Sequence, residues 1–194
     1  MMIRDMTIRH LRGIKECRIH DLGQINLLIG KNSAGKSTIL ESIQLVSSVV
    51  IYPAQAISSL VNRRSDRSWH PQELWYKYNT SLELSVSLLF DDGNTITVQG
   101  HQEATPEDRE SIVFYASGKG VKDSTILKKF DSRNSEGLAE QSSRGRRMQK
   151  YEPDRKSMQK SGFPDSVLNF LENTDLIEPT GSTQTSVLER DFQS

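Results

Sequence analysis

The chain has 194 residues, enough for one compact domain or for one domain with a tail. Its 25 basic and 25 acidic residues cancel, which excludes a protein-wide field that would attract nucleic acid or a membrane. Hydrophobic residues make up only 35% of the chain, so the composition predicts a folded part beside a poorly packed part. The single cysteine, Cys17, excludes an intramolecular disulfide and a cysteine-based zinc site.

The sequence shows neither a secretory signal nor a membrane-spanning stretch. Residues 1–5 contain no apolar signal core, and the apolar stretch at 39–57 is interrupted by Glu41, several serines and Pro53. We therefore expect a cytoplasmic protein with no membrane partner.

The first 30 residues predict three strands. Residues 6–10 and 14–20 are extended runs with apolar positions, joined by a turn at Leu11-Arg12-Gly13. Residues 25–29 are almost wholly apolar, which predicts a strand buried on both faces.

From Lys36 the apolar residues follow a helical period. The stripe predicts a helix that begins near Lys36 and ends before Pro53, and its members are Ile39, Leu40, Ile43 and Val46. The polar and aromatic residues 62–78 predict a surface loop or a short helix.

Strands return after residue 80. Residues 82–90 alternate between apolar and polar side chains, Asp91-Asp92-Gly93-Asn94 is a hairpin turn, and residues 95–99 form the returning strand. Residues 112–115 predict one more strand. We assign residues 1–130 to a single lobe.

Apolar residues nearly vanish between residues 131 and 162, while serine, glutamine and basic residues dominate. This composition predicts a flexible basic linker. Residues 163–171 predict a short helix and the remainder a tail, so residues 163–194 look like an incomplete domain.

A phosphate-binding loop stands between the third predicted strand and the helix. Two glycines let the backbone amides converge on a phosphate, Lys36 reaches the β- and γ-phosphates, and the Ser37 hydroxyl takes one Mg²⁺ position. A solvated glycine-serine-lysine loop is the alternative, but the flanking strand and helix favour a site for ATP with Mg²⁺. The pattern G-x-x-x-x-G-K-[ST] is matched by Gly30, Lys31, Asn32, Ser33, Ala34, Gly35, Lys36 and Ser37, and Thr38 completes the binding set.

The segment MTIRHLRGIKECRIHDLGQINLLIGKNSAGKSTILESIQLV resembles the N-terminal lobe of the ABC-type ATPases of the SMC and RecF class. It is most similar to the RecF-like AAA domains of overcoming-lysogenization-defect nucleases and of bacterial anti-phage systems. The resemblance covers about the first 50 residues, including Leu11-Arg12-Gly13, Asn32 in the loop, and Ile39-Leu40-Glu41-Ser42-Ile43. It implies an α/β fold: a P-loop NTPase lobe with a mixed sheet around the P-loop helix and an antiparallel β-subdomain. The composition adds the expectation of a poorly ordered C-terminal part.

The resemblance also implies partners. In this class two lobes enclose ATP, with a Ser-Gly-Gly signature segment facing the loop and a Walker B strand ending in Asp-Glu. It therefore implies a second ATPase lobe, in a homodimer or a partner subunit, and a nucleotide contact for Arg12. An exposed turn residue is the alternative for Arg12.

Two segments imitate the missing half of such a site. Residues 88–92 read as apolar residues before two aspartates, but Gly93 and Asn94 favour a hairpin end. Residues 117–120 imitate a signature, yet no amphipathic helix follows, and we predict a loop. Hydrolysis then needs residues supplied from elsewhere. Two hypotheses remain: the ATP-binding lobe of an ATPase in DNA repair or anti-phage defence, or a non-catalytic nucleotide sensor that controls a partner subunit.

Two groups of basic residues are candidates for DNA contacts, and solvated surface is the alternative for both. The first consists of Arg63, Arg64 and Arg67, and the second is the run from Arg144 to Lys160. Trp69 and Trp75 predict packing within a loop.

Overall fold

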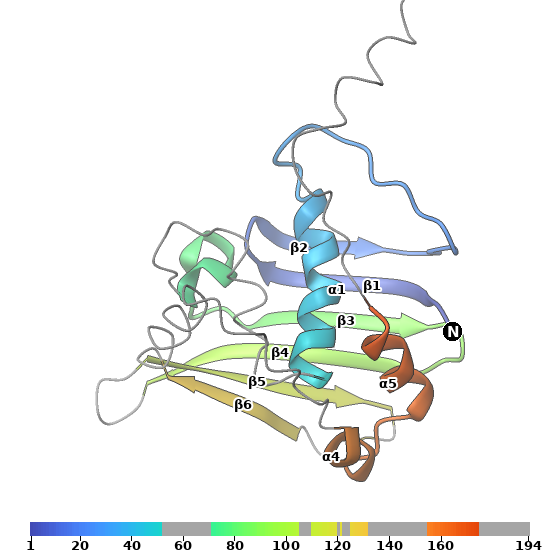
Figure 1. Ribbon diagram of the computed structural model, residues 1–194. Coiled ribbons are helices and arrows are strands. Elements are labelled where there is room, and N and C mark those ends of the chain that lie inside the picture. The colour runs from blue at the N-terminus through green and yellow to red at the C-terminus, as the bar shows by residue number, and fades with distance from the viewer. Residues whose placement is uncertain (52–70, 105–109, 120, 122–124, 132–154, 175–194) are drawn as a thin grey trace, which may run out of the picture.

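The computed structural model describes residues 1–51, 71–104, 110–119, 121, 125–131 and 155–174. In these residues six strands form one sheet in the order β2-β1-β3-β4-β5-β6, and helix α1 crosses one face of it (Figure 1). Every neighbouring pair is antiparallel. The strands are β1 (Ile3–Leu11), β2 (Ile14–Ile19), β3 (Leu84–Phe90), β4 (Thr95–Ala104), β5 (Glu110–Gly118) and β6 (Thr125–Asp131). The helices are α1 (Lys36–Ile51), α4 (Arg155–Lys160) and α5 (Asp165–Glu172), with 3₁₀ turns η1 (Pro71–Leu74) and η2 (Tyr76–Tyr78).

The hairpin between β3 and β4 confirms the predicted turn. The Asp92 carboxylate accepts hydrogen bonds from the backbone and side-chain amides of Asn94, at 3.0 and 2.8 Å. Gly93, with φ of 78°, supplies the left-handed residue that the turn needs. The register pairs Leu88 with Ile96 and Val86 with Val98, so apolar residues of both strands lie on one face.

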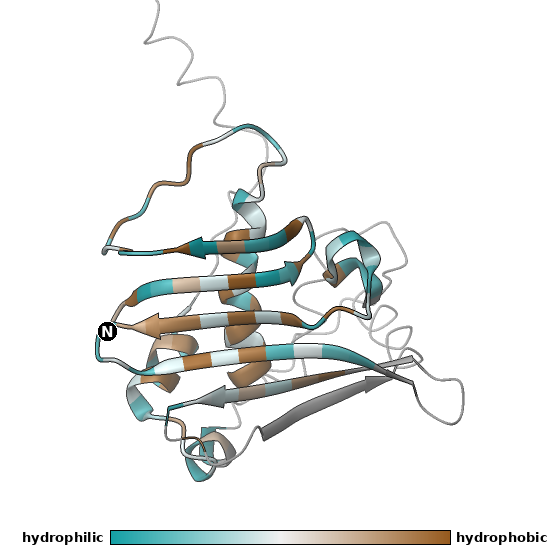
Figure 2. Cartoon of the chain, turned by 180° about the vertical axis from the view of Figure 1, so that it is seen from behind, coloured by the Kyte–Doolittle hydropathy of each residue, from teal (hydrophilic) through white to brown (hydrophobic). Residues whose placement is uncertain are grey.

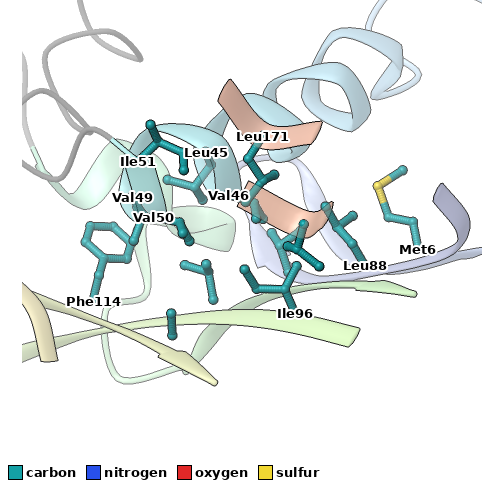
Figure 3. Close-up of a cluster of buried hydrophobic side chains, with 14 of the residues drawn as sticks. Met6, Leu45, Val46, Val49, Val50, Ile51, Leu88, Ile96, Phe114 and Leu171 are labelled. Atoms are coloured by element: carbon teal, nitrogen blue, oxygen red, sulfur yellow. The ribbon is translucent and has the colours of Figure 1, made fainter. Parts of the chain in front are cut away.

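Helix α1 packs its second half against that apolar face. Residues 45–51 are at most 7% exposed, and they meet side chains from β1, β3, β4 and β5 in one cluster (Figure 3). Gly100 permits a close approach here, because a β-carbon at that position would lie 2.8 Å from Cε1 of Phe114. Burial of the sheet face and of the helix therefore depends on the same contacts.

Helices α4 and α5 cover the C-terminal part of α1 (Figure 1). The Ser47 hydroxyl of α1 donates to the Leu171 carbonyl in the last turn of α5, at 2.7 Å and in a buried position. Arg155 of α4 pairs with Glu172 of α5 at 2.7 Å. The predicted helix at 163–171 is confirmed as α5, one or two residues later.

The 3₁₀ turns close the end of the sheet beside the β1–β2 turn. Trp75 is 1% exposed, and its indole N–H donates to the Leu82 carbonyl at 2.8 Å. Leu11 forms an isolated bridge with Trp75. This confirms the predicted packing role of Trp75, whereas Arg63, Arg64, Arg67 and Trp69 lie outside the described residues.

Hydrophilic and hydrophobic residues follow one another along β1, β3 and β4 (Figure 2), and polar side chains pair with one another on the sheet face turned away from α1. Ser87 and Thr97, paired in register across β3 and β4, share a hydrogen bond of 2.9 Å there. On β1 and β2, Glu16 accepts from Arg9 and Arg18. The hydrogen bonds from Arg18 lower the pKa of Glu16 below its usual value. One apolar and one polar face account for this change of side-chain character along β1, β3 and β4.

The prediction of a buried strand at residues 25–29 is wrong. The segment is extended but belongs to no described strand, and Ile25, Leu27 and Ile29 are 94%, 81% and 84% exposed. A strand forms only where a neighbour satisfies its backbone groups, and no described strand pairs with these residues. The prediction of a mixed sheet is also wrong, because every pair of neighbouring strands in the described sheet is antiparallel.

Three further expectations need correction. The sequence predicts no strand at the position of β6, and β5 continues through Gly118 where the sequence predicts a loop. Residues 155–160 form α4, although the sequence predicts a flexible linker as far as residue 162. Met158 of this helix is 4% exposed in the core, which explains why a polar segment folds here. Residues 132–154, most of the predicted linker, and residues 175–194 lie outside the described residues.

Among the described residues, no helix combines the length and the apolar character needed to cross a bilayer.

Candidate functional site

The predicted phosphate-binding loop curls back on itself between the extended segment and α1. The Ala34 amide donates to the Lys31 carbonyl across 3.2 Å, and the Ile39 amide donates to the Gly35 carbonyl at 3.0 Å. Gly35 has φ of 85°, which a glycine adopts without the steric cost of a side chain. A β-carbon there would also lie 3.4 Å from Cγ1 of Ile14 in β2.

The Lys36 side chain turns back over this loop. Its Nζ donates to the carbonyl oxygens of Gly30 and Lys31, each at 2.7 Å. An ammonium group has three N–H donors, so these two bonds hold the charge in place and leave donor capacity for an anion. The first and seventh residues of the motif therefore meet, and the loop between them is closed into a ring.

A hollow of about 540 Å³ lies against the loop. Protein pockets that bind small molecules commonly measure roughly 300–1,000 Å³. The β1–β2 turn and the loop with the first residues of α1 line it together: Gly13, Ile14, Asn32, Ser33, Ala34, Gly35, Lys36, Ser37 and Thr38.

The hollow adjoins the positive end of a helix dipole. Helix α1 is 16 residues long and has no acidic residue in its first turn. The amides of Lys36, Ser37 and Thr38 precede the first helical hydrogen bond, which Ile39 makes, so the helix offers them no acceptor. Such amides and the helix dipole attract an anion. The local chemistry favours a phosphate group.

Arg12 does not line the hollow, but it is joined directly to the wall residues that follow it in the chain. Its Nη1 lies 2.8 Å from Oε2 of Glu41, and the two side chains are 28% and 9% exposed. The Arg12 backbone has φ of 50°, and its amide donates to the Leu74 carbonyl at 2.8 Å. The next two residues, Gly13 and Ile14, belong to the wall of the hollow.

The acidic pair that imitates a Walker B strand lies far from this place. Asp91 exchanges hydrogen bonds with Met2, just before β1 begins, whereas the hollow adjoins the turn after β1 ends. The nine residues of β1 span roughly 26 Å at the usual rise of a strand. Bonds from Asn94 lower the pKa of Asp92, as expected for a turn carboxylate.

The signature-like residues 117–119 are likewise part of the sheet. Ser117 and Gly118 end β5, and the Lys119 amide donates to the Thr95 carbonyl at 3.3 Å. Neither imitation contributes to the hollow.

Most of the predicted site residues come together. Residues 32–38 line the hollow, and the carbonyls of Gly30 and Lys31 hold the Lys36 ammonium, whereas Arg12 does not line the hollow and pairs with Glu41. Sequence reasoning missed the wall formed by Gly13 and Ile14 and the pairing of Arg12 with Glu41. The signal for the wall was present in the turn Leu11-Arg12-Gly13, but only the hairpin brings that turn to the loop.

Ser37 is the predicted Mg²⁺ ligand, and its exposed side chain is part of the hollow. In the part of the chain that the structure describes, no group of three His, Cys, Asp or Glu side chains is arranged to hold a metal ion. Mg²⁺ in nucleotide sites is commonly held by one or two protein oxygens, phosphate oxygens and water. A hydroxyl beside a phosphate-sized anion site fits that pattern.

Comparison with known proteins agrees with the geometry of the loop. A model of the AAA ATPase domain matches residues 1–174. An uncharacterized protein of Methanocaldococcus jannaschii is 35% identical over 107 residues, covering 53% of this chain and 49% of that protein.

More distant similarity involves proteins with named functions. An ATP/GTP phosphatase of Helicobacter pylori is 22% identical, over 50% of this chain and 27% of that protein. The DNA replication and repair protein RecF of Ligilactobacillus salivarius is 28% identical, over 45% of this chain and 23% of its own length. The chain thus matches half or less of the length of these relatives.

Proposed function

Because the chain belongs to the AAA ATPase domain family, which implies ATP binding, we propose that it holds ATP with Mg²⁺ in the hollow at residues 30–38. The observation that carries the proposal is the Lys36 ammonium, held at 2.7 Å from the carbonyls of Gly30 and Lys31 beside the start of α1. A fixed cation and a row of helix amides around one hollow suit a chain of phosphates.

Each group has a part in this proposal. Lys36 neutralises charge on the β- and γ-phosphates, and the amides at the start of α1 donate to phosphate oxygens. Ser37 supplies a hydroxyl ligand to Mg²⁺, which when bound offsets phosphate charge. Residues 32–35 let the backbone approach closely, and Gly13 and Ile14 form the facing wall.

The distant RecF relatives support an ATPase of the RecF-like kind. The role of these relatives in DNA replication and repair supports DNA repair as the process, and DNA as a partner, for the present chain. Anti-phage defence is the other process that the resemblance suggests. A second ATPase lobe, from another copy or a partner subunit, would provide the signature segment and the acidic residues.

One observation favours the second candidate function, nucleotide sensing without turnover. Asp91 and Asp92 lie at the opposite end of β1 from the hollow, and the described residues place no other acidic pair in its lining. Hydrolysis needs a positioned water and its base in addition to a bound phosphate. Phosphate release by the chain, measured with and without DNA, distinguishes an ATPase lobe from a sensor.

The decisive experiment replaces Lys36 and a matched neighbour. Lys36→Ala removes a charged hydrogen-bond donor to the phosphates, so we expect roughly 10- to 150-fold weaker Mg-ATP binding in calorimetric titration. Lys31→Ala is the control. It removes an equally charged, exposed side chain, while the backbone carbonyl of residue 31 remains available to Lys36. Equal affinity of the Lys36→Ala variant and the wild-type chain would contradict the proposal.

A further inference from the structure

A carboxylate is buried in α1 next to the proposed nucleotide site. Glu41 follows Ser37 by four residues, one turn along the helix, and its side chain is 9% exposed. A charged carboxylate loses most of its hydration in such a place, and it stays charged at low cost only beside a cation. The cation here is Arg12, at 2.8 Å.

Arg12 extends from a turn that is fixed at several points. Its backbone is left-handed, which is uncommon for a residue with a side chain and persists where the surroundings determine it. The amide is bound to the Leu74 carbonyl, and the preceding Leu11 is 2% exposed and bridged to Trp75. The backbone that carries the Arg12 side chain is therefore held in place, and the ion pair with Glu41 positions the guanidinium itself.

The ion pair spans two walls of the hollow. Arg12 is followed by Gly13 and Ile14, which line it from the hairpin, and Glu41 lies one turn beyond Ser37, which lines it from the helix. The Arg12 side chain is 28% exposed, so the pairing with Glu41 leaves part of it accessible to solvent. A guanidinium has five N–H donors in a planar fork, enough to engage a carboxylate on one side and a phosphate on the other.

We propose that Glu41 is a positioning residue that holds the Arg12 guanidinium at the edge of the hollow, so that Arg12 bridges the carboxylate and the nucleotide phosphates. The inference rests on the proposed function, because it concerns the same bound ATP. Glu41 has no contact with the nucleotide of its own and acts only through Arg12. This distinguishes it from a clasp that merely fastens α1 to the β1–β2 turn.

The test is a double-mutant cycle on Mg-ATP affinity, read by calorimetry beside a thermal melt. Arg12→Gln is expected to weaken binding about tenfold, the size of one lost charged hydrogen bond, and Glu41→Gln by a smaller factor. Since Glu41 acts through Arg12, adding Glu41→Gln to Arg12→Gln should weaken binding no further. Arg12→Lys keeps a cation beside Glu41, so its melting temperature should lie above that of Arg12→Gln. Its Mg-ATP affinity should stay as low as that of Arg12→Gln, because an ammonium lacks the planar fork.

Arg155 and Glu172 provide the matched control. They form an ion pair of 2.7 Å between α4 and α5, with side chains 32% and 19% exposed, and belong to no part of the hollow. Glu172→Gln should lower the melting temperature as Glu41→Gln does while leaving ATP affinity unchanged.

The outcomes separate the two levels of the proposal. If wild type binds no ATP, the proposed function fails and this inference with it. If wild type binds ATP and Lys36→Ala binds it more weakly by the factor expected above, the site stands. Two results would then overturn the positioning role alone. One is an unchanged Mg-ATP affinity in Glu41→Gln or in Arg12→Lys. The other is a further loss of affinity when Glu41→Gln is added to Arg12→Gln.

Discussion

Two apolar runs of this chain have similar composition and opposite surroundings. Residues 45–51 of α1 are at most 7% exposed between the sheet and α5, whereas Ile25, Leu27 and Ile29 are all more than four-fifths exposed. The first run has a partner surface among the described residues, and the second is an extended segment beside no described strand. An apolar run is therefore stabilised by burial, but whether it is buried depends on the surfaces that the fold places beside it.

Alanine substitutions at matched leucines should separate the two runs most widely. Leu45 is 0% exposed, so Leu45→Ala leaves a cavity and should lower the free energy of unfolding by about 2–5 kcal/mol. Leu27→Ala removes a side chain that is 81% exposed and should change it by less than about 0.5 kcal/mol. Urea unfolding measures both. A cost for Leu27→Ala comparable to that for Leu45→Ala would mean that the extended segment is packed in solution.

Glycine substitutions extend the comparison to the backbone. At Gly118 a β-carbon would lie 2.5 Å from the Thr95 carbonyl oxygen, so Gly118→Ala forces β4 and β5 apart and should cost about 1–3 kcal/mol. At Gly13, in the wall of the hollow, a β-carbon would have no atom within 4 Å. Gly13→Ala should leave stability unchanged or raise it by about 0.4–1 kcal/mol, because the unfolded chain loses freedom. Thermal unfolding that ranks Gly13→Ala below Gly118→Ala would contradict this difference between the two regions.

The parts of the fold that could be predicted depend on local chemistry. The turn at residues 91–94 carries its own hydrogen-bond acceptor, and the glycines and Lys36 of the loop define a phosphate-binding pattern by themselves. Helix α4 could not be predicted because it depends on contacts with distant residues: Met158 enters the core formed by the sheet and α1. Strand β6 pairs with the preceding strand β5, and its extension depends on that neighbour. The prediction for residues 25–29 failed for the same reason, since a strand depends on its neighbours.

The candidate site divides in the same way. Residues 30–38 form one continuous segment, and the sequence identified all of them. Gly13, Ile14 and the pairing of Arg12 with Glu41 depend on the hairpin that carries the β1–β2 turn to α1, and 29 positions separate the two charges along the chain. No local sequence pattern predicts such an ion pair, and it is identified from the distance between the two side chains in the folded structure.

The smallest predicted effect concerns α5, which covers the buried run of α1. The Asp165 carboxylate accepts hydrogen bonds from Gln159 at 2.6 Å and from Arg155 at 3.3 Å, and these contacts lower its pKa below the ordinary value of 3.8. A lowered pKa means that the folded state binds the proton less tightly than the unfolded state does. The carboxylate therefore stabilises the folded state at pH values above its ordinary pKa, and this contribution is lost as the pH falls through the lowered pKa.

Asp165→Asn removes this titration without removing the side chain. The melting temperature of the variant should lie slightly below that of wild type at pH values well above 3.8, and the difference should vanish below the lowered pKa. The effect should be small because the group is exposed and solvent screens its contacts. A carboxyl resonance of Asp165 that titrates at or above its ordinary pKa would show that α4 and α5 do not hold this contact in solution. Residues 45–51 would then be packed less tightly against α5 than against the sheet.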